Sequence, residues 1–399
     1  MQAPSQRSER TGRLRRATAA LLLLLGSLAL VFVAGEGVLR VAYGRAEPYV
    51  LARLVHYDEQ LGWRLTPGAY EFFNPASFTY VEIAIDERGV RGGPRSPSPA
   101  PGRRRLTVVG DSFVFSEGLS EGELFTDGLQ ALVGPECEVV NAGVPGYGTG
   151  QETLFVEKLR AQGFSLGQTV VLVFFTNDLS DNAGLAYESL EPDPRKPVFE
   201  VRGDELVQTP TTPWPPVPVE AIADQLARRS LFLAFVRNRV EILAASNPWI
   251  VTLLARVQAR VPIPRPPGVI LGWYAPGWEE RWARTRGILR HFARVVQSDG
   301  TRLLIAFMPS PFQAEEVFDA VLRSHTDEPL YAAFLADRDR PQRALLEFCA
   351  EEELRCLDLT PALRAPRNQP AFFLHEGHLA RFGSALVARE LHAALNEGC

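Results

Sequence analysis

The sequence has few of the residues that most often bind metal ions. Its 399 residues include four cysteines and six histidines. The cysteines, at positions 137, 349, 356 and 399, show no metal-ligand spacing, so the chain gives no sign of a metal site. Cys349 and Cys356 are close enough along the chain to form a disulfide in an oxidising compartment. Buried free thiols are the alternative.

The chain also lacks a strong net charge of either sign. The chain has 42 Lys and Arg residues against 47 Asp and Glu residues, which gives a formal net charge of −5. This balance gives no reason to expect a nucleic-acid partner. With 46% hydrophobic and 22% charged residues, the composition is that of a globular protein. The length allows one large domain or two modest ones.

Only one stretch is apolar and long enough to cross a membrane. Residues 17–34 carry no charge, and the apolar character extends past Glu36 to residue 39, which predicts a single-pass transmembrane anchor over residues 17–39. The arginine-rich tail of residues 1–16 would stay in the cytoplasm, so the remainder would lie outside it. A cleaved signal peptide is the alternative, although no clear cleavage motif follows the apolar run.

The rest of the chain divides into four parts. Residues 44–103 are expected to form an extracytoplasmic lead-in that ends in a linker rich in Pro, Ser, Gly and Arg. Residues 104–182 and 279–399 alternate short apolar runs with amphipathic segments, which predicts two halves of one α/β domain with a parallel sheet. Residues 183–278 break that pattern and predict a mainly helical insertion. The five predicted strands are Leu106–Val109, Glu138–Asn141, Thr169–Phe175, Leu303–Phe307 and Arg355–Leu359.

Polar turns follow the first three predicted strands. Ser112 comes after the first strand, Gly143 after the second and Asn177 after the third. The carboxyl ends of parallel strands meet at one edge of the sheet, where such folds bind their ligands. A serine at such a turn is a candidate nucleophile if a base and an oxyanion site lie near it. A serine that only caps the following helix is the alternative.

Together with His378, these turns resemble the SGNH (GDSL) hydrolase superfamily. Its four sequence blocks are matched, in order, by Gly110-Asp111-Ser112-Phe113, Asn141-Ala142-Gly143, Thr176-Asn177-Asp178 and Glu376-Gly377-His378. The resemblance covers about residues 104–182 and 285–396. It implies a three-layer α/β/α, flavodoxin-like fold with about five parallel strands in the order 2-1-3-4-5. The anchor resembles that of a bacterial subgroup, which implies a cell inner membrane protein with its catalytic domain in the periplasm.

The resemblance also implies a role for each site residue. Ser112 would attack an acyl carbonyl, and His378 would act as general base and then as general acid. The backbone N–H groups of Ser112 and Gly143 and the side-chain amide of Asn177 would form the oxyanion hole. An ordinary turn glycine and a helix cap are the alternatives for Gly143 and Asn177. The family chemistry requires no metal and no organic cofactor.

The acid of the catalytic triad is where the sequence departs from the family pattern. The family usually has an aspartate three residues before the histidine, and His375 occupies that position here. Glu376, two residues before His378, is the candidate acid, because its carboxylate can accept a hydrogen bond from the histidine ring. The alternative is a Ser–His dyad with Glu376 at the surface.

We therefore predict a membrane-anchored serine esterase that hydrolyses acyl esters, acetyl esters among them, through an acyl-enzyme on Ser112. Its substrate would be an acyl ester or an O-acylated glycan. An O-acyltransferase acting on a cell-envelope polysaccharide would use the same residues. A non-catalytic envelope binding module with this fold is the third hypothesis. The end of the insertion and the helix after it also contain aromatic residues that fit either a sugar-stacking or acyl-binding lip or the core of the insertion, namely Trp273, Tyr274, Trp278 and Trp282.

Overall fold

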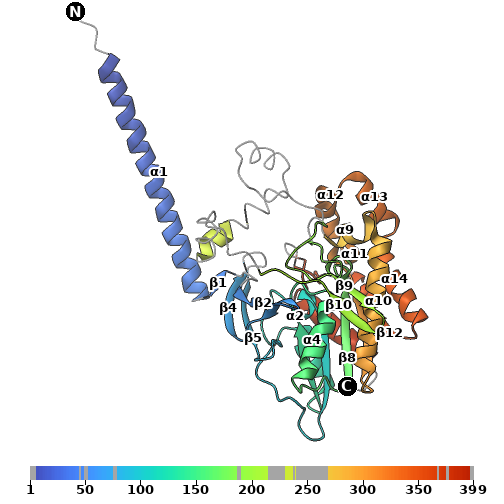
Figure 1. Ribbon diagram of the computed structural model, residues 1–399. Coiled ribbons are helices and arrows are strands. Elements are labelled where there is room, and N and C mark those ends of the chain that lie inside the picture. Colours follow the sequence, from blue (N-terminus) through green and yellow to red (C-terminus); the bar gives the residue numbers. More distant parts are fainter. Residues whose placement is uncertain are drawn as a thin grey trace, which may run out of the picture.

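The centre of the computed structural model is a five-stranded parallel sheet (Figure 1). The structure describes residues 6–44, 46–48, 53–74, 79–186, 190–213, 230–236, 239, 268–365, 368–373 and 377–395. The strands of the sheet are β6 (Arg104–Gly110), β7 (Cys137–Gly143), β8 (Thr169–Phe175), β11 (Arg302–Met308) and β12 (Arg355–Asp358). Their order is β12-β11-β8-β6-β7. Counted along the chain and read from β7, this is 2-1-3-4-5, so the predicted topology is confirmed.

The position of each strand in the sheet follows from its apolar content. All seven residues of β8 are buried, as expected for a central strand with helices on both faces. In contrast, β12 lies at one edge and is only partly buried. Each of the five predicted strands ends within two residues of the observed strand. The apolar runs were therefore a sufficient signal for the sheet.

Helices flank the sheet and complete the α/β fold. α3 (Phe125–Val133) packs against α16 (Arg381–Ala394), and α4 (Thr149–Ala161) packs against α10 (Trp278–Gln297). Cys349 in α14 (Arg340–Glu351) forms a disulfide with Cys356 in β12, as the first of the two alternatives predicted. The remaining short helices of this domain are α5 (Asp178–Asp181), α11 (Pro311–Ala314), η3 (Glu316–Phe318), α12 (Asp319–His325), α13 (Glu328–Ala336) and α15 (Thr360–Arg364).

The lead-in packs against the main sheet, and Arg91 is one of the residues that join the two. It contains the hairpin of β2 (Val55–Asp58) and β3 (Gly62–Leu65) and a small sheet of β1 (Glu47–Pro48), β4 (Gly68–Asn74) and β5 (Thr79–Ile85). Arg91 forms antiparallel bridges with Ile85 of β5 and with Asn141 of β7. Arg91, in the segment expected to be a linker, and Arg105, at the start of β6, are both fully buried. The lead-in therefore packs as part of the α/β domain.

The insertion is described only in part. Its hairpin of β9 (Phe199–Arg202) and β10 (Glu205–Gln208) packs on α10, and it ends in α9 (Gly268–Tyr274). Residues 231–236 are helical, whereas most of the segment predicted to be helical falls outside the described residues. Trp273, Tyr274 and Trp282 are buried and pack in the main core. These three residues are therefore core residues and do not form a substrate-binding lip, but the core they join is the main one, and the predicted separate core of the insertion is wrong for them.

The amino-terminal apolar stretch forms one long helix, α1 (Gln6–Tyr43), which projects from the rest of the protein (Figure 1). Residues Arg15–Tyr43 are long and apolar enough to cross a membrane, and the most apolar part is not buried by the protein. A membrane anchor and a signal sequence both have these properties.

Candidate active site

Ser112 lies at the sharp turn between β6 and α2 (Ser112–Phe115). β6 ends at Gly110, and the carboxylate of Asp111 then caps α2 by accepting a hydrogen bond from the Phe113 backbone N–H at 2.8 Å. Because Ser112 is the first helical residue, its own N–H has no acceptor inside the helix and is available to a ligand. The turn thus exposes a hydroxyl and a backbone N–H together.

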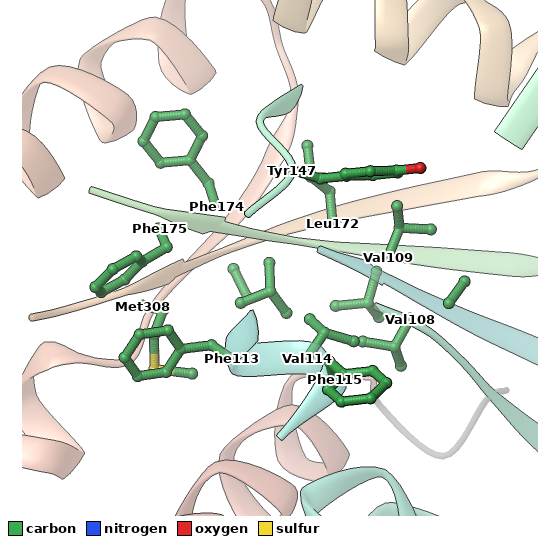
Figure 2. Close-up of a cluster of buried hydrophobic side chains, with 14 of the residues drawn as sticks. Val108, Val109, Phe113, Val114, Phe115, Tyr147, Leu172, Phe174, Phe175 and Met308 are labelled. Carbon is green, nitrogen blue, oxygen red and sulfur yellow. The ribbon is translucent and has the colours of Figure 1, made fainter. Parts of the chain in front are cut away.

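The short helix α2 is held in place by its apolar side chains (Figure 2). Phe113, Val114 and Phe115 are all buried. The ring of Phe113 lies 4.1 Å from the ring of Phe175, measured between centroids. On its other side Phe113 contacts the His378 ring, at a centroid distance of 5.1 Å. The residue after Ser112 therefore supports the imidazole as well as the helix.

His378 lies just before α16 and is held beside Ser112 by backbone contacts of the residues around it. An antiparallel bridge joins Phe372 to Leu379, and Phe373 N–H donates to the His378 carbonyl at 2.8 Å. His378 Nε2 lies 2.9 Å from Ser112 Oγ. This is hydrogen-bond distance, so the structure brings together the predicted nucleophile and the predicted base.

The protonation of His378 follows from its surroundings. Burial lowers the pKa of His378 to about 4, so the ring is neutral at pH 7 and Nε2 can accept the serine proton. The other nitrogen, Nδ1, is buried and has no hydrogen-bond partner among the residues that the structure describes. His375 and Glu376 lie outside the described residues, and the assignment of Glu376 as the acid stays a prediction.

Gly143 lies at the end of β7 and packs against α2. A Cβ atom at position 143 would collide with the Phe115 backbone nitrogen and lie 2.7 Å from the Val114 carbonyl carbon, so glycine permits close packing of β7 on α2. The Gly143 N–H donates to the side-chain oxygen of Asn141 at 3.0 Å. Asn141 in turn donates to the Val114 carbonyl at 2.7 Å. In this state Asn141 occupies the Gly143 donor that the resemblance assigned to the oxyanion hole.

Asn177 follows β8 and is almost fully buried. The next residue, Asp178, fixes the turn, because its carboxylate accepts hydrogen bonds from the Phe175 N–H at 2.8 Å and from Thr149 Oγ1 at 3.0 Å. The Asn177 amide interacts with Asp111, although burial dominates and raises the pKa of Asp111 to about 7. Asn177 therefore contacts the residue that directly precedes Ser112.

A group of buried carboxyls lies beneath these turns. Burial raises the pKa of Asp181 to about 6, and it raises the pKa values of Asp178 and of Glu152, in α4, well above their usual range. Both carboxyl oxygens of Glu152 are buried and have no hydrogen-bond partner in the described part of the chain, whereas Lys196 pairs with Asp181. Among the described residues no group of three or more His, Cys, Asp or Glu side chains has the geometry to hold a metal ion. Burial therefore favours the protonated forms of Glu152 and Asp178 close to the candidate site, whereas Lys196 favours the ionised form of Asp181.

One positioning residue was not predicted from the sequence. Arg91 is fully buried and donates hydrogen bonds to the backbone carbonyls of Phe115, Ser116 and Leu119. Its Nε pairs with the Glu121 carboxylate at 3.0 Å. The guanidinium thus binds the carboxyl end of α2. An arginine among Gly, Pro and Ser residues gave no local signal of this role.

No protein-family model and no curated protein matches the chain. Solved structures similar to it include one named as a lipolytic protein of the G-D-S-L family from Desulfitobacterium hafniense, with 9% identity, a TM-score of 0.36, and coverage of 73% of this chain and 100% of that one. A carbohydrate acetylesterase family member from Sinorhizobium meliloti has 12% identity, a TM-score of 0.33, and coverage of 73% and 97%. A catalytic mutant of an acetylxylan esterase from Geobacillus stearothermophilus has 11% identity, a TM-score of 0.38, and coverage of 73% and 94%. All three TM-scores are below 0.5, so the function of this chain is inferred from its own residues.

Proposed function

We propose that this chain is a serine ester hydrolase of the SGNH type, anchored in a membrane by α1 and active outside the cytoplasm. The observation that carries the proposal is the 2.9 Å contact between Ser112 Oγ and His378 Nε2 at the carboxyl edge of a parallel sheet. The four sequence blocks that resemble the SGNH superfamily support it. The substrate is an acyl ester, including the acetyl esters of O-acylated glycans.

The reaction proceeds by two acyl transfers. Ser112 Oγ attacks the ester carbonyl carbon while His378 Nε2 takes the hydroxyl proton. The tetrahedral intermediate then collapses: the bond to the alcohol oxygen breaks, and the alcohol leaves with the proton from His378. Water repeats the sequence on the acyl-enzyme, which releases the carboxylic acid and restores both residues.

The negative oxygen of each tetrahedral intermediate needs donors that are already in place. The free N–H of Ser112 and the amide of Asn177 meet that need from two different turns. The Gly143 N–H donates to the Asn141 side-chain oxygen. It contributes to the oxyanion hole when it donates to the oxyanion as well as to Asn141, or to the oxyanion in place of Asn141. Glu376 accepts from His378 Nδ1 if the site works as a triad, and a dyad needs no such partner.

Two further features support a location outside the cytoplasm. Arginines precede the apolar part of α1, and positive charge is retained on the cytoplasmic side of a membrane. The disulfide between Cys349 and Cys356 is a bond that persists in oxidising compartments.

Ester turnover by the full chain in detergent micelles tests the proposal. p-Nitrophenyl acetate and longer-chain esters serve as substrates, with Ser112→Ala and His378→Ala as variants and Ser298→Ala, at an exposed serine at the end of α10, as the control. We expect each catalytic variant to lose on the order of 10³-fold or more in kcat. Absence of turnover by a folded wild-type chain on every ester would instead favour a transferase that needs its own acceptor, or a binding module.

A further inference from the structure

The outer end of α1 packs against a short apolar helix of the insertion. Residues 231–236, here named the insertion helix, read Leu-Phe-Leu-Ala-Phe-Val. The insertion helix lies beside the end of α1 nearest the body, drawn in yellow-green in Figure 1. Its Leu231 is fully buried in a small cluster with Leu39 of α1 and Phe73 of β4. The end of α1 therefore packs directly on the folded domain.

A charged side chain of α1 fixes this contact. Glu36 accepts a hydrogen bond from Ser230 Oγ at 2.7 Å and another from the Phe232 backbone N–H at 3.0 Å. The same carboxylate pairs with Arg40 Nε at 2.8 Å, one turn further along α1. Glu36 thus caps the insertion helix from a neighbouring helix, and the cap sets where along α1 the insertion helix sits.

The two helices approach closely at Phe232. A Cβ atom on Gly35 would collide with the Phe232 ring, so glycine at this position allows the ring to lie against the α1 backbone. The rings of Phe32 and Phe232 meet edge to face, with 6.0 Å between their centroids. Phe232 therefore contacts α1 over the turn that precedes Glu36.

The depth of this contact follows from the length of α1. A bilayer hydrocarbon core is about 30 Å thick and takes about 20 helical residues. Counted from Ala17, the first residue after the arginine-rich tail, that length ends at Glu36. Phe232 then lies level with the last apolar turn of α1, at the outer surface of the membrane.

The exposed part of the insertion helix has the composition of a lipid interface. Val236 is 38% exposed, and Phe235 is partly exposed. The Arg239 guanidinium lies 5.1 Å from the centre of the Phe235 ring. Aromatic side chains and arginines together are typical of the level at which lipid headgroups meet the acyl chains.

We propose that the insertion helix is a second membrane contact, which rests in the outer lipid interface beside α1. The inference rests on the proposed anchor, since α1 must span the membrane for the insertion helix to reach the lipid. The two contacts together hold the catalytic domain at one height and one orientation over the membrane surface.

Depth-dependent fluorescence quenching tests this in the full chain. The protein is reconstituted into phosphatidylcholine–phosphatidylglycerol vesicles that carry a nitroxide near the headgroup end of an acyl chain. An environment-sensitive maleimide dye is attached to Val236→Cys, to Val31→Cys in the apolar run, or to Val317→Cys in the catalytic domain. All three positions are exposed, and Cys137, Cys349 and Cys356 are disulfide-bonded.

We expect the lipid nitroxide to quench the dye at position 236 nearly as well as at position 31, and several times more than at position 317. Glu36→Ala, which removes the cap, should lower the quenching at position 236 and leave position 31 unchanged. Iodide added to the buffer quenches a dye that is exposed to water. If the lipid nitroxide quenches the dye at position 31, while the dye at position 236 is quenched only by iodide, the anchor stands and the second contact is refuted. If position 31 is not quenched by lipid, the anchor fails, and the second contact fails with it.

Discussion

Replacing Arg91 with alanine should destabilise the catalytic domain strongly, although Arg91 lies outside the Ser112–His378 pair. The Arg91 side chain is fully buried and donates at 2.9 Å to the Ser116 carbonyl and at 2.6 Å to the Leu119 carbonyl. Each buried carbonyl that loses its donor costs about 1–3 kcal/mol, whereas the lost pair with Glu121 adds little, because the Glu121 side chain is 35% exposed. We expect the free energy of unfolding to fall by about 4 kcal/mol, a large part of the 5–15 kcal/mol typical of a domain.

Urea titration followed by tryptophan fluorescence measures this change. Arg91→Lys keeps the charge but cannot reach all three carbonyls at once, so it should cost about 2 kcal/mol. Because α2 has only four residues, a shift at its carboxyl end moves Ser112, and we expect kcat to fall about tenfold or more in Arg91→Lys. Arg202→Ala is the matched control, since Arg202 is 70% exposed in its ion pair with Glu200 and its loss should cost well under 1 kcal/mol. An Arg91→Ala protein within 1 kcal/mol of wild type, with unchanged kcat, would refute the reasoning.

Three further outcomes are expected from the site and its surroundings. Activity requires neutral His378, whose pKa burial lowers to about 4, so kcat/KM for p-nitrophenyl acetate should fall only as the pH drops through about 4. If the fall comes instead near the ordinary histidine pKa of about 6.5, an ionised partner such as Glu376 raises the pKa and the site is a triad. Burial raises the pKa of Glu152 well above its usual range, so the folded chain keeps this proton while the unfolded chain loses it above about pH 4.3, and stability falls as the pH rises. Glu152→Gln should therefore unfold at a higher urea concentration than wild type at about pH 8, and a lower midpoint there would show that Glu152 is stabilising as a carboxylate. The double change Cys349→Ser and Cys356→Ser, which removes one disulfide, should lower the free energy of unfolding by about 2 kcal/mol, and an unchanged denaturation curve would mean that this bond carries no stability.

The sheet could be predicted from the sequence because its signal is local. Each strand is a short apolar run bounded by a polar turn, and Thr169–Phe175 coincides with β8. The packed aromatic residues were harder to assign, since the sequence pattern of Trp273 and Tyr274 does not distinguish a core from a surface lip. Burial in the main core comes from helices that are distant in sequence.

The pair at the centre of the site was also predicted, because Ser112 and His378 each follow a recognisable turn. What could not be predicted is the set of contacts between segments far apart along the chain. Arg91 holds α2 from a segment that looked like a linker, and Asn141 occupies the Gly143 donor. Such contacts depend on three-dimensional packing, which residue spacing does not encode. Glu376 stays a prediction, because it lies outside the described residues.

Covalent trapping tests the central claim, an acyl-enzyme on Ser112, most directly. A fluorophosphonate reacts with a serine that is activated by a neighbouring base and mimics the tetrahedral intermediate. We predict one adduct per chain, located on Ser112 by mass spectrometry, absent in Ser112→Ala and formed far more slowly in His378→Ala. A folded chain that forms no adduct at Ser112, or forms it equally fast without His378, would contradict the account.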